Sequence, residues 1–209
     1  MAAETMKAVR VMAYHAPMVI QDVPIPTVES PLDVIVRIGA AGMSLAQLAA
    51  RAALTRSTGV CRTDIHICDG EWKEKSNVKL PYTIGHENAG WVQEVGSSVS
   101  NVKVGDKVIL HPLVTCGLCT ACRFGDDVHC EDSKFPGINV DGGYAEYLRT
   151  TARSVIKLDD RLEPSDVAAL ADAGLTAYHV VAKAARILRP GDYCVMIGAG
   201  GVSVCLSCR

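Results

Sequence analysis

The sequence lacks an apolar run long enough to cross a lipid bilayer. A spanning helix needs roughly 20 apolar residues. The longest candidate, residues 167–188, is interrupted by Asp172, His179, Lys183 and Arg186. The sequence therefore argues against a membrane protein.

The N-terminus lacks the apolar core and the small-residue cleavage site of a secretory signal, because Lys7, Arg10 and His15 interrupt its apolar residues. We therefore expect a cytoplasmic protein. In that compartment, the nine cysteines of the chain indicate metal binding or catalysis rather than disulfides.

An excess of one charge sign is also missing. The chain has 21 Lys and Arg residues against 23 Asp and Glu residues, for a formal net charge of -2. The basic residues are scattered, so no basic face is available for a phosphate backbone, and we expect no nucleic-acid partner. A content of 49% hydrophobic and 21% charged residues is typical of a folded chain, and 209 residues suffice for one domain and part of a second.

Short strands separated by turns are predicted over the first three quarters of the chain, because apolar residues gather in short runs between turn residues such as Gly96, Gly105 and Gly142. The clearest predicted strands are residues 33–38, 89–95, 107–110 and 144–148. No internal repeat or low-complexity linker interrupts them. The pattern predicts a mostly β, barrel-like domain.

The apolar spacing becomes helical beyond Leu162. Pro164 suits the first turn of a helix, and Ser165 and Asp166 would place a capping side chain and a negative charge at its positive end. The continuous apolar run at residues 193–197 is typical of a buried parallel strand. An α/β unit is therefore expected to start here.

Four cysteines lie in one short segment: Cys116-x-x-Cys119-x-x-Cys122, then seven residues and Cys130. Thiolates at this spacing can surround a zinc ion tetrahedrally. A bacterial iron-sulfur run would need its fourth Cys after three residues and then a Pro, which this sequence does not have. Four cysteines within fifteen residues also exceed any need of core packing. The segment therefore predicts a structural zinc site.

A four-cysteine zinc module for nucleic acid is the functional alternative for this segment. Acidic residues surround the cysteines, namely Asp126, Asp127, Glu131 and Asp132. They would repel a phosphate backbone, so this alternative is disfavoured.

Three separate stretches, residues 61–66, 85–90 and 171–176, each contain side chains able to bind a metal. Each stretch alone is a weak signal. Together they could build a second zinc site with sulfur, nitrogen and oxygen ligands, and a catalytic zinc keeps one position open for water or substrate.

The order of these stretches, and above all the pattern Gly85-His86-Glu87-x-x-Gly90-x5-Gly96, resembles the zinc-dependent medium-chain alcohol dehydrogenases. The resemblance covers residues 7–42 and 60 to about 202. It implies a mostly β GroES-like barrel domain at residues 1–173, with a structural zinc lobe at 112–132, followed by the start of an α/β Rossmann nucleotide-binding domain at 174–209.

The resemblance implies two zinc ions per chain. Cys61, His86 and Asp172 correspond to the catalytic zinc ligands, with Asp172 where other members carry Cys, and Glu87 is an alternate ligand. The structural zinc would be held by Cys116, Cys119, Cys122 and Cys130.

Roles in proton transfer are also implied by the resemblance. Thr63 corresponds to the hydroxyl that takes the alcohol proton, and His66 to the group that passes it to water. Asp64 corresponds to the carboxylate that orients the zinc-bound histidine.

A nicotinamide cofactor is implied as well, because Gly198, Gly200 and Gly201 stand where the family has its dinucleotide fingerprint, although Ser203 replaces the third glycine. No acidic residue follows about twenty positions on, so the choice between NAD and NADP is open. The implied activity is reversible oxidation of primary or secondary alcohols to aldehydes or ketones, and family members are homo-oligomers.

Two departures from the family pattern qualify these expectations. Seventeen residues, Met43 to Gly59, stand between Gly42 and Val60, and we interpret them as an insertion. The sequence also stops at Arg209, so we expect impaired catalysis by this chain. A polyol dehydrogenase, or a catalytically inactive zinc-binding fragment or subunit partner, remains an alternative, and turnover would separate the active from the inactive possibility.

Overall fold

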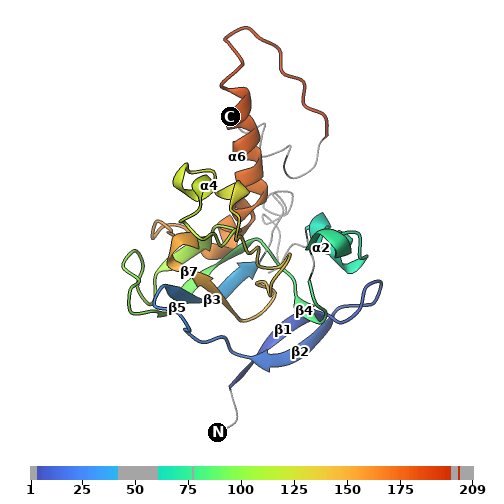
Figure 1. Cartoon of the computed structure of the whole chain (residues 1–209), viewed down its shortest axis with the longest axis vertical. Coiled ribbons are helices and arrows are strands. Elements are labelled where there is room, and N and C mark those ends of the chain that lie inside the picture. The colour runs from blue at the N-terminus through green and yellow to red at the C-terminus, as the bar shows by residue number, and fades with distance from the viewer. Residues whose placement is uncertain (1–3, 42–60, 77, 199–201, 203–209) are drawn as a thin grey trace.

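The computed structural model describes residues 4–41, 61–76, 78–198 and 202. Two antiparallel sheets form the centre of the described chain, and short helices lie around them (Figure 1). No helix in these ranges is long and apolar enough to span a membrane. The insertion expected at residues 43–59 lies outside the described residues.

The smaller sheet has the strand order β2-β1-β4, formed by β2 (Val19–Pro24), β1 (Thr5–Val11) and β4 (Tyr82–Thr83). In β1, Met6, Ala8 and Val11 are buried. The inner side of this sheet contributes to a cluster that also holds Ile84 and Ile138. The cluster also contains Ile67, which follows the predicted catalytic residue His66 in the sequence.

The larger sheet has the order β7-β3-β5-β6-β8. Its strands are β3 (Asp33–Ala41), β5 (Asn88–Val95), β6 (Lys107–Leu110), β7 (Tyr147–Thr151) and β8 (Val155–Lys157). Its inner face is a cluster of aliphatic side chains: Val34, Val36, Val92, Val102, Val108, Leu110, Leu148 and Val155. The strands predicted at residues 33–38, 89–95 and 107–110 are confirmed.

The larger sheet is strongly curled. Its edge strands β7 and β8 are joined only by the short 3-10 helix η2 (Ala152–Ser154), a connection that reaches at most about 14 Å. In a flat sheet, four inter-strand spacings would separate them by about 19 Å. The barrel-like expectation is therefore met in curvature, but β7 and β8 do not pair in the described part of the chain, so the barrel is not closed.

The strand predicted at residues 144–148 was misplaced, because β7 begins only at Tyr147. Tyr144 and Ala145 belong to the other sheet: the backbone N–H of Val9 donates to the carbonyl of Tyr144, and Ala8 bridges to Ala145. The chain thus crosses from one sheet to the other within the segment that looked like one strand.

The helical spacing beyond Leu162 corresponds to three short elements: α5 (Pro164–Val167), η3 (Ala168–Ala171) and α6 (Ala173–Ala184). Pro164 occupies the first turn as predicted, but the N-cap is Glu163, so Ser165 does not cap the helix. The interruption at Asp172, with φ -125° and ψ -60°, separates η3 from α6. In Figure 1, α6 extends away from the sheets.

The buried strand predicted at residues 193–197 is not formed. Among the described residues this segment belongs to no strand, and Tyr193 and Ile197 are 97% and 95% exposed. A parallel strand is buried only when neighbouring strands and crossover helices cover it, and no described strand lies next to this one.

The remaining helices are short and lie near the predicted sites. They are α2 (Arg62–Cys68), α3 (Lys73–Ser76), α4 (Thr120–Arg123) and the 3-10 helix η1 (Asp127–His129). The first two follow the predicted ligand Cys61, α4 contains Cys122, and η1 lies between Cys122 and Cys130.

Candidate metal centres

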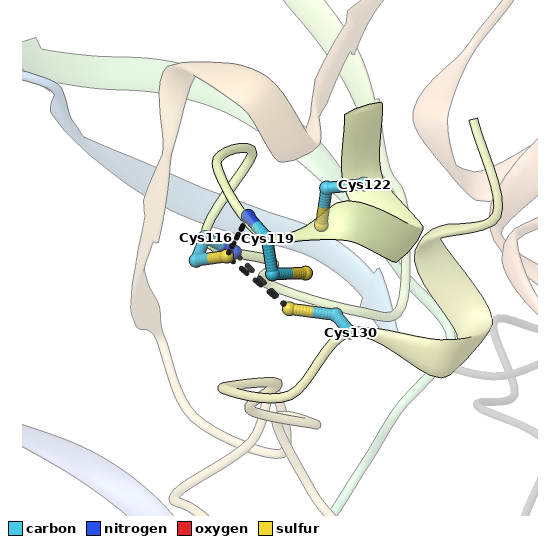
Figure 2. A group of neighbouring side chains, drawn as sticks. All are labelled: Cys116, Cys119, Cys122 and Cys130. Atoms are coloured by element: carbon cyan, nitrogen blue, oxygen red, sulfur yellow. Dashed lines mark hydrogen bonds between the residues drawn. The ribbon is translucent and has the colours of Figure 1, made fainter. Parts of the chain in front are cut away.

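The structure brings the four predicted cysteines together in the cysteine lobe, residues 112–132. Cys119 is the N-cap of α4, Cys122 lies within α4, and Cys130 follows η1. The sulfur atoms of Cys116, Cys119, Cys122 and Cys130 lie within 4.8 Å of one another and converge on one point (Figure 2).

The sulfur spacing fits a tetrahedral metal rather than a disulfide. The Sγ atoms of Cys116 and Cys130 are 3.7 Å apart, whereas a disulfide needs about 2.05 Å. Four sulfur atoms at about 2.3 Å from a zinc ion would be separated by about 3.8 Å. The described cysteines are all free, so the lobe is suited to a metal ion.

Backbone amides prepare three of the four sulfur atoms for the charged form, whereas burial raises the pKa of the fourth, Cys122, to about 12. The N–H groups of Leu118 and Cys119 donate to Sγ of Cys116 at 3.4 and 3.3 Å, and that of Cys116 donates to Cys130 at 3.4 Å. Backbone hydrogen bonds from Cys122 and Glu131 lower the pKa of Cys119 to about 6. A thiolate is the metal-binding form of cysteine.

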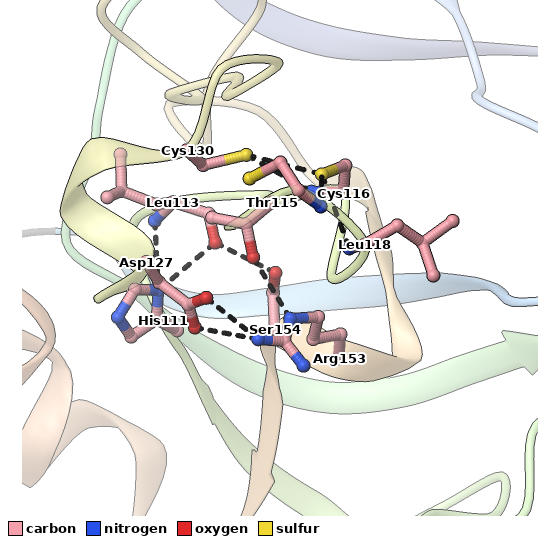
Figure 3. Close-up of polar contacts among 10 residues, drawn as sticks. His111, Leu113, Thr115, Cys116, Leu118, Asp127, Cys130, Arg153 and Ser154 are labelled. Atoms are coloured by element: carbon pink, nitrogen blue, oxygen red, sulfur yellow. Dashed lines mark hydrogen bonds and ion pairs between the residues drawn. The ribbon is translucent and has the colours of Figure 1, made fainter. Parts of the chain in front are cut away.

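The lobe is attached to the larger sheet through η2 (Figure 3). Both terminal oxygens of Asp127 accept from Nη2 of Arg153, at 2.7 and 3.0 Å, and Nε of Arg153 donates to Thr115 at 3.0 Å. Next to it, the hydroxyl of Ser154 donates to the carbonyl of Leu113 at 2.9 Å. Two consecutive residues therefore hold both ends of the lobe.

His86 lies in the connection between β4 and β5 and is 2% exposed. The preceding Gly85 has φ +99°, a conformation that favours glycine. A Cβ at Gly85 would lie 2.4 Å from Cδ1 of Tyr144. Gly85 thus lets the chain turn closely past Tyr144 and direct His86 inward.

Two carboxylates face the two ring nitrogens of His86. Nδ1 lies 3.3 Å from Oδ1 of Asp64, and Nε2 lies 3.4 Å from Oδ2 of Asp172. Neither nitrogen has a well-aligned hydrogen bond among the described residues. Burial lowers the pKa of His86, but contacts with Asp172, Asp64 and Cys61 outweigh it and raise the pKa to about 12. The surroundings of the ring therefore favour a positive charge, which a divalent cation would also supply.

Cys61 immediately precedes α2 and is half-buried. Its contact with His86 lowers the pKa of the thiol, against the effect of burial, and Thr63 lowers it further through backbone and side-chain hydrogen bonds. Cys61 and Asp172 thus lie beside His86. We call these three residues the His86 site. They are less compact than the lobe cysteines, which alone among the described residues hold at least three ligand atoms within 4.8 Å of one another.

The break between η3 and α6 places Asp172 beside His86. As the N-cap of α6 its side chain is 29% exposed, and Oδ1 accepts from the hydroxyl of Thr176 at 3.5 Å. Glu87, which is 5% exposed, accepts from the N–H of Ala173 at 3.0 Å. Burial raises the pKa of Glu87 to about 7. Both carboxylates therefore meet the first turn of α6.

Thr63 and His66 lie on α2, a helix that the sequence analysis did not predict. Nδ1 of His66 is 2.7 Å from Oε2 of Glu71, although the angle falls short of an aligned hydrogen bond. His66 and Glu71 also line a surface pocket of about 510 Å³. His66 thus connects α2 with solvent.

Two residues with contacts at these centres carry no motif. Tyr144 donates its hydroxyl to Oδ2 of Asp64 at 3.0 Å, and Arg153 holds the cysteine lobe. Neither has a spacing that links it to a metal ligand. The glycine pair Gly142-Gly143 before Tyr144 was the available signal, because it indicates a close backbone approach.

The predicted cofactor fingerprint is only partly described. Gly198 has φ +115°, consistent with a glycine-dependent turn, whereas Gly200 and Gly201 lie outside the described residues.

Comparison with known proteins identifies the class. The alcohol dehydrogenase GroES-like domain family matches residues 53–160, which is about half of the chain and includes the Gly85–Gly96 pattern and the cysteine lobe. The chain belongs to this family.

Several similar proteins are alcohol dehydrogenases. The crystal structure of the alcohol dehydrogenase from the hyperthermophilic archaeon Aeropyrum pernix shares 49% identity with a TM-score of 0.77, covering 90% of this chain and 50% of that one. The NAD-dependent alcohol dehydrogenase of Sulfurisphaera tokodaii is 35% identical over 201 residues, covering 94% of this chain and 52% of its own length. An alcohol dehydrogenase of Geobacillus stearothermophilus is 40% identical over 150 residues, covering 70% and 43%. The chain thus spans about half the length of these relatives.

Proposed function

We propose that this chain binds two zinc ions, one structural and one catalytic. Cys116, Cys119, Cys122 and Cys130 would hold the structural ion, and Cys61, His86 and Asp172 would hold the catalytic one, with Glu87 as an alternate ligand. The main observation behind this proposal concerns His86. Its buried ring nitrogens lack aligned hydrogen-bond partners among the described residues, while two carboxylates and a thiol lie around the ring. This donor set of sulfur, nitrogen and oxygen suits zinc.

We further propose that the chain is the catalytic part of a nicotinamide-dependent alcohol dehydrogenase, which interconverts primary or secondary alcohols with aldehydes or ketones. Zinc at the His86 site supplies Lewis-acid polarisation of the substrate oxygen. The nicotinamide, NAD or NADP, supplies the hydride acceptor. Its binding would involve Gly198, Gly200 and Gly201 at the start of a second domain, with the boundary near residues 173 and 174.

The chain's own side chains provide a path for the alcohol proton. The hydroxyl of Thr63, which hydrogen-bonds the Cys61 thiol, would accept that proton. His66, one turn further along α2, would pass it to the solvent-exposed pocket. At the pocket end of this path the carboxylate of Glu71 lies 2.7 Å from Nδ1 of His66.

Metal stoichiometry tests the two sites separately. Elemental analysis of the purified chain is expected to give two zinc ions. Cys119→Ser should remove the structural ion and His86→Ala the catalytic one, each leaving the other in place. A chain without zinc at full expression in zinc-supplemented medium, or the loss of both ions in His86→Ala, would contradict the assignment.

Substrate binding tests the function itself. In a chain loaded with cobalt(II), primary or secondary alcohols should perturb the visible absorption of the ion at the His86 site and leave that of the lobe unchanged. Nicotinamide absorbance then follows oxidation with NAD and with NADP. An unchanged cobalt spectrum at saturating alcohol would contradict an alcohol-binding metal centre.

A further inference from the structure

Asp64 is a buried carboxylate with three polar neighbours. It is 1% exposed, although it lies on the short helix α2. Its Oδ2 accepts from the backbone N–H of Cys61 at 3.1 Å and from the hydroxyl of Tyr144 at 3.0 Å. Its Oδ1 faces Nδ1 of His86 at 3.3 Å. One oxygen of this carboxylate therefore accepts two hydrogen bonds, while the other faces His86.

The division between the two oxygens depends on where the Tyr144 hydroxyl lies. The backbone of Tyr144 is held on both sides, since its N–H donates to Ile84 at 2.9 Å and its carbonyl accepts from Val9 at 2.7 Å. Its ring packs so closely on Gly85 that a Cβ there would lie 2.4 Å from Cδ1. A tyrosine whose backbone is held by β1 and by the residue that follows β4 can hold its hydroxyl in one place.

We propose that Tyr144 is a positioning residue for the metal ligand His86. By holding Oδ2 of Asp64, its hydroxyl keeps Oδ1 against Nδ1 of His86, so that Nε2 stays directed toward Asp172. Hydrogen bonds that orient a ligating histidine tune its metal affinity. This inference rests on the proposed zinc site. It adds Tyr144, from a distant part of the sequence, to the contact between His86 and Asp64.

The same apolar cluster provides a matched control. Tyr82 is 3% exposed and belongs to the cluster against which Tyr144 packs. Its hydroxyl has no hydrogen-bond partner among the described residues. Tyr82→Phe and Tyr144→Phe therefore each remove one hydroxyl at the same cluster, but only Tyr144→Phe removes a contact with Asp64.

The experiment measures zinc affinity at both sites of each variant by competition with a chromophoric chelator. Tyr144→Phe should weaken zinc binding at the His86 site by about tenfold or more, with a lobe affinity close to that of Tyr82→Phe and a cooperative unfolding transition retained. In an Asp64→Asn background, Tyr144→Phe should have little further effect, because the acceptor that it orients has already changed.

The outcomes separate this inference from the function on which it rests. If the unmodified chain binds no zinc at the His86 site, the proposed function fails. If it binds zinc and Tyr144→Phe leaves that affinity unchanged, the positioning role is overturned. An equal loss at both sites, or a lost unfolding transition, would give Tyr144 a general structural role and would also overturn it.

Discussion

At the scale of single residues, Glu87 shows how burial and a helix end oppose each other. Burial raises the pKa of this carboxyl from its ordinary value of 4.5 to about 7, although the N–H of Ala173 and the charge of His86 act in the other direction. The folded chain thus holds the proton of Glu87 more tightly than the unfolded chain. By linkage, this tighter proton binding contributes to the free energy of unfolding. The contribution is complete below about pH 4.5 and is lost as the pH rises to about 7.

Glu87→Gln should remove this dependence in the metal-free chain. A neutral amide is not penalised as the pH rises, so the variant should gain stability relative to the unmodified chain between about pH 5 and pH 7.5. One pKa unit corresponds to about 1.4 kcal/mol, and about 3 kcal/mol is the upper limit for the gain. Urea unfolding at both pH values measures it, with Glu94→Gln at the exposed end of β5 as control. A gain that does not change with pH would show that Glu87 does not titrate in this window.

At the scale of elements, local patterns predicted the strands that are held by their own sheet. Residues 33–38 and 89–95 became β3 and β5 because their apolar side chains fill one cluster. The structure of residues 144–148 was harder to predict from local pattern, because Tyr144 contacts Val9 and Ile84, which lie far from it in the sequence. The apolar run at residues 193–197 likewise predicted a buried strand, but no strand among the described residues pairs with this segment.

The pairing of β3 with β5 explains one glycine of the family pattern. Gly90 lies opposite Ile38, beside a bulge, and a Cβ at Gly90 would stand 2.1 Å from the carbonyl oxygen of Arg37. Backbone on both strands would have to move to make room. A side chain at this position is therefore incompatible with the sheet as it stands.

Gly90→Ala should destabilise the chain by roughly 3 kcal/mol or more, at the upper end of the range for single substitutions. Gly105→Ala is the control, because Gly105 has φ +90° but no atom within 4 Å of its Cβ position. It should cost only the strain of the left-handed conformation, about 1–2 kcal/mol. Thermal unfolding compares the two variants, and equal losses would show that the close approach is relaxed in solution.

At the scale of the whole molecule, the His86 site is assembled from segments that no sequence window contains together. Cys61 precedes α2, His86 follows β4, and Asp172 stands at the break before α6. The close approach of the four lobe cysteines was predictable, because all four belong to one short segment. Spacing alone did not predict the contacts of His86 with Asp64 and Asp172, which only the family resemblance implied. The attachment of the lobe through Arg153 became visible only in the fold.

The cysteine lobe should depend on its metal more than any other described part of the molecule. None of the hydrophobic clusters formed by the described residues includes a residue from 112–132. The lobe is held instead by the converging cysteines and by the contacts of Arg153 and Ser154. Where metal binding replaces a core, its free energy is folding free energy.

Removal of the metal with a strong chelator should therefore loosen residues 112–132 first. Hydrogen exchange of the backbone amides should rise there and at η2, where Arg153 loses an ordered Asp127, while β3 and β5 remain protected by the cluster around Val34 and Val92. Arg153→Gln should raise exchange in the lobe even with the metal bound, but by less, because a half-exposed ion pair contributes about 1 kcal/mol or less. Arg149→Gln, which removes an exposed arginine of β7 that pairs with Glu29, is the matched control and should leave the lobe unchanged. Unaltered protection of the lobe after complete metal removal would mean that its backbone contacts suffice to hold it, and that the cysteines are not its structural support.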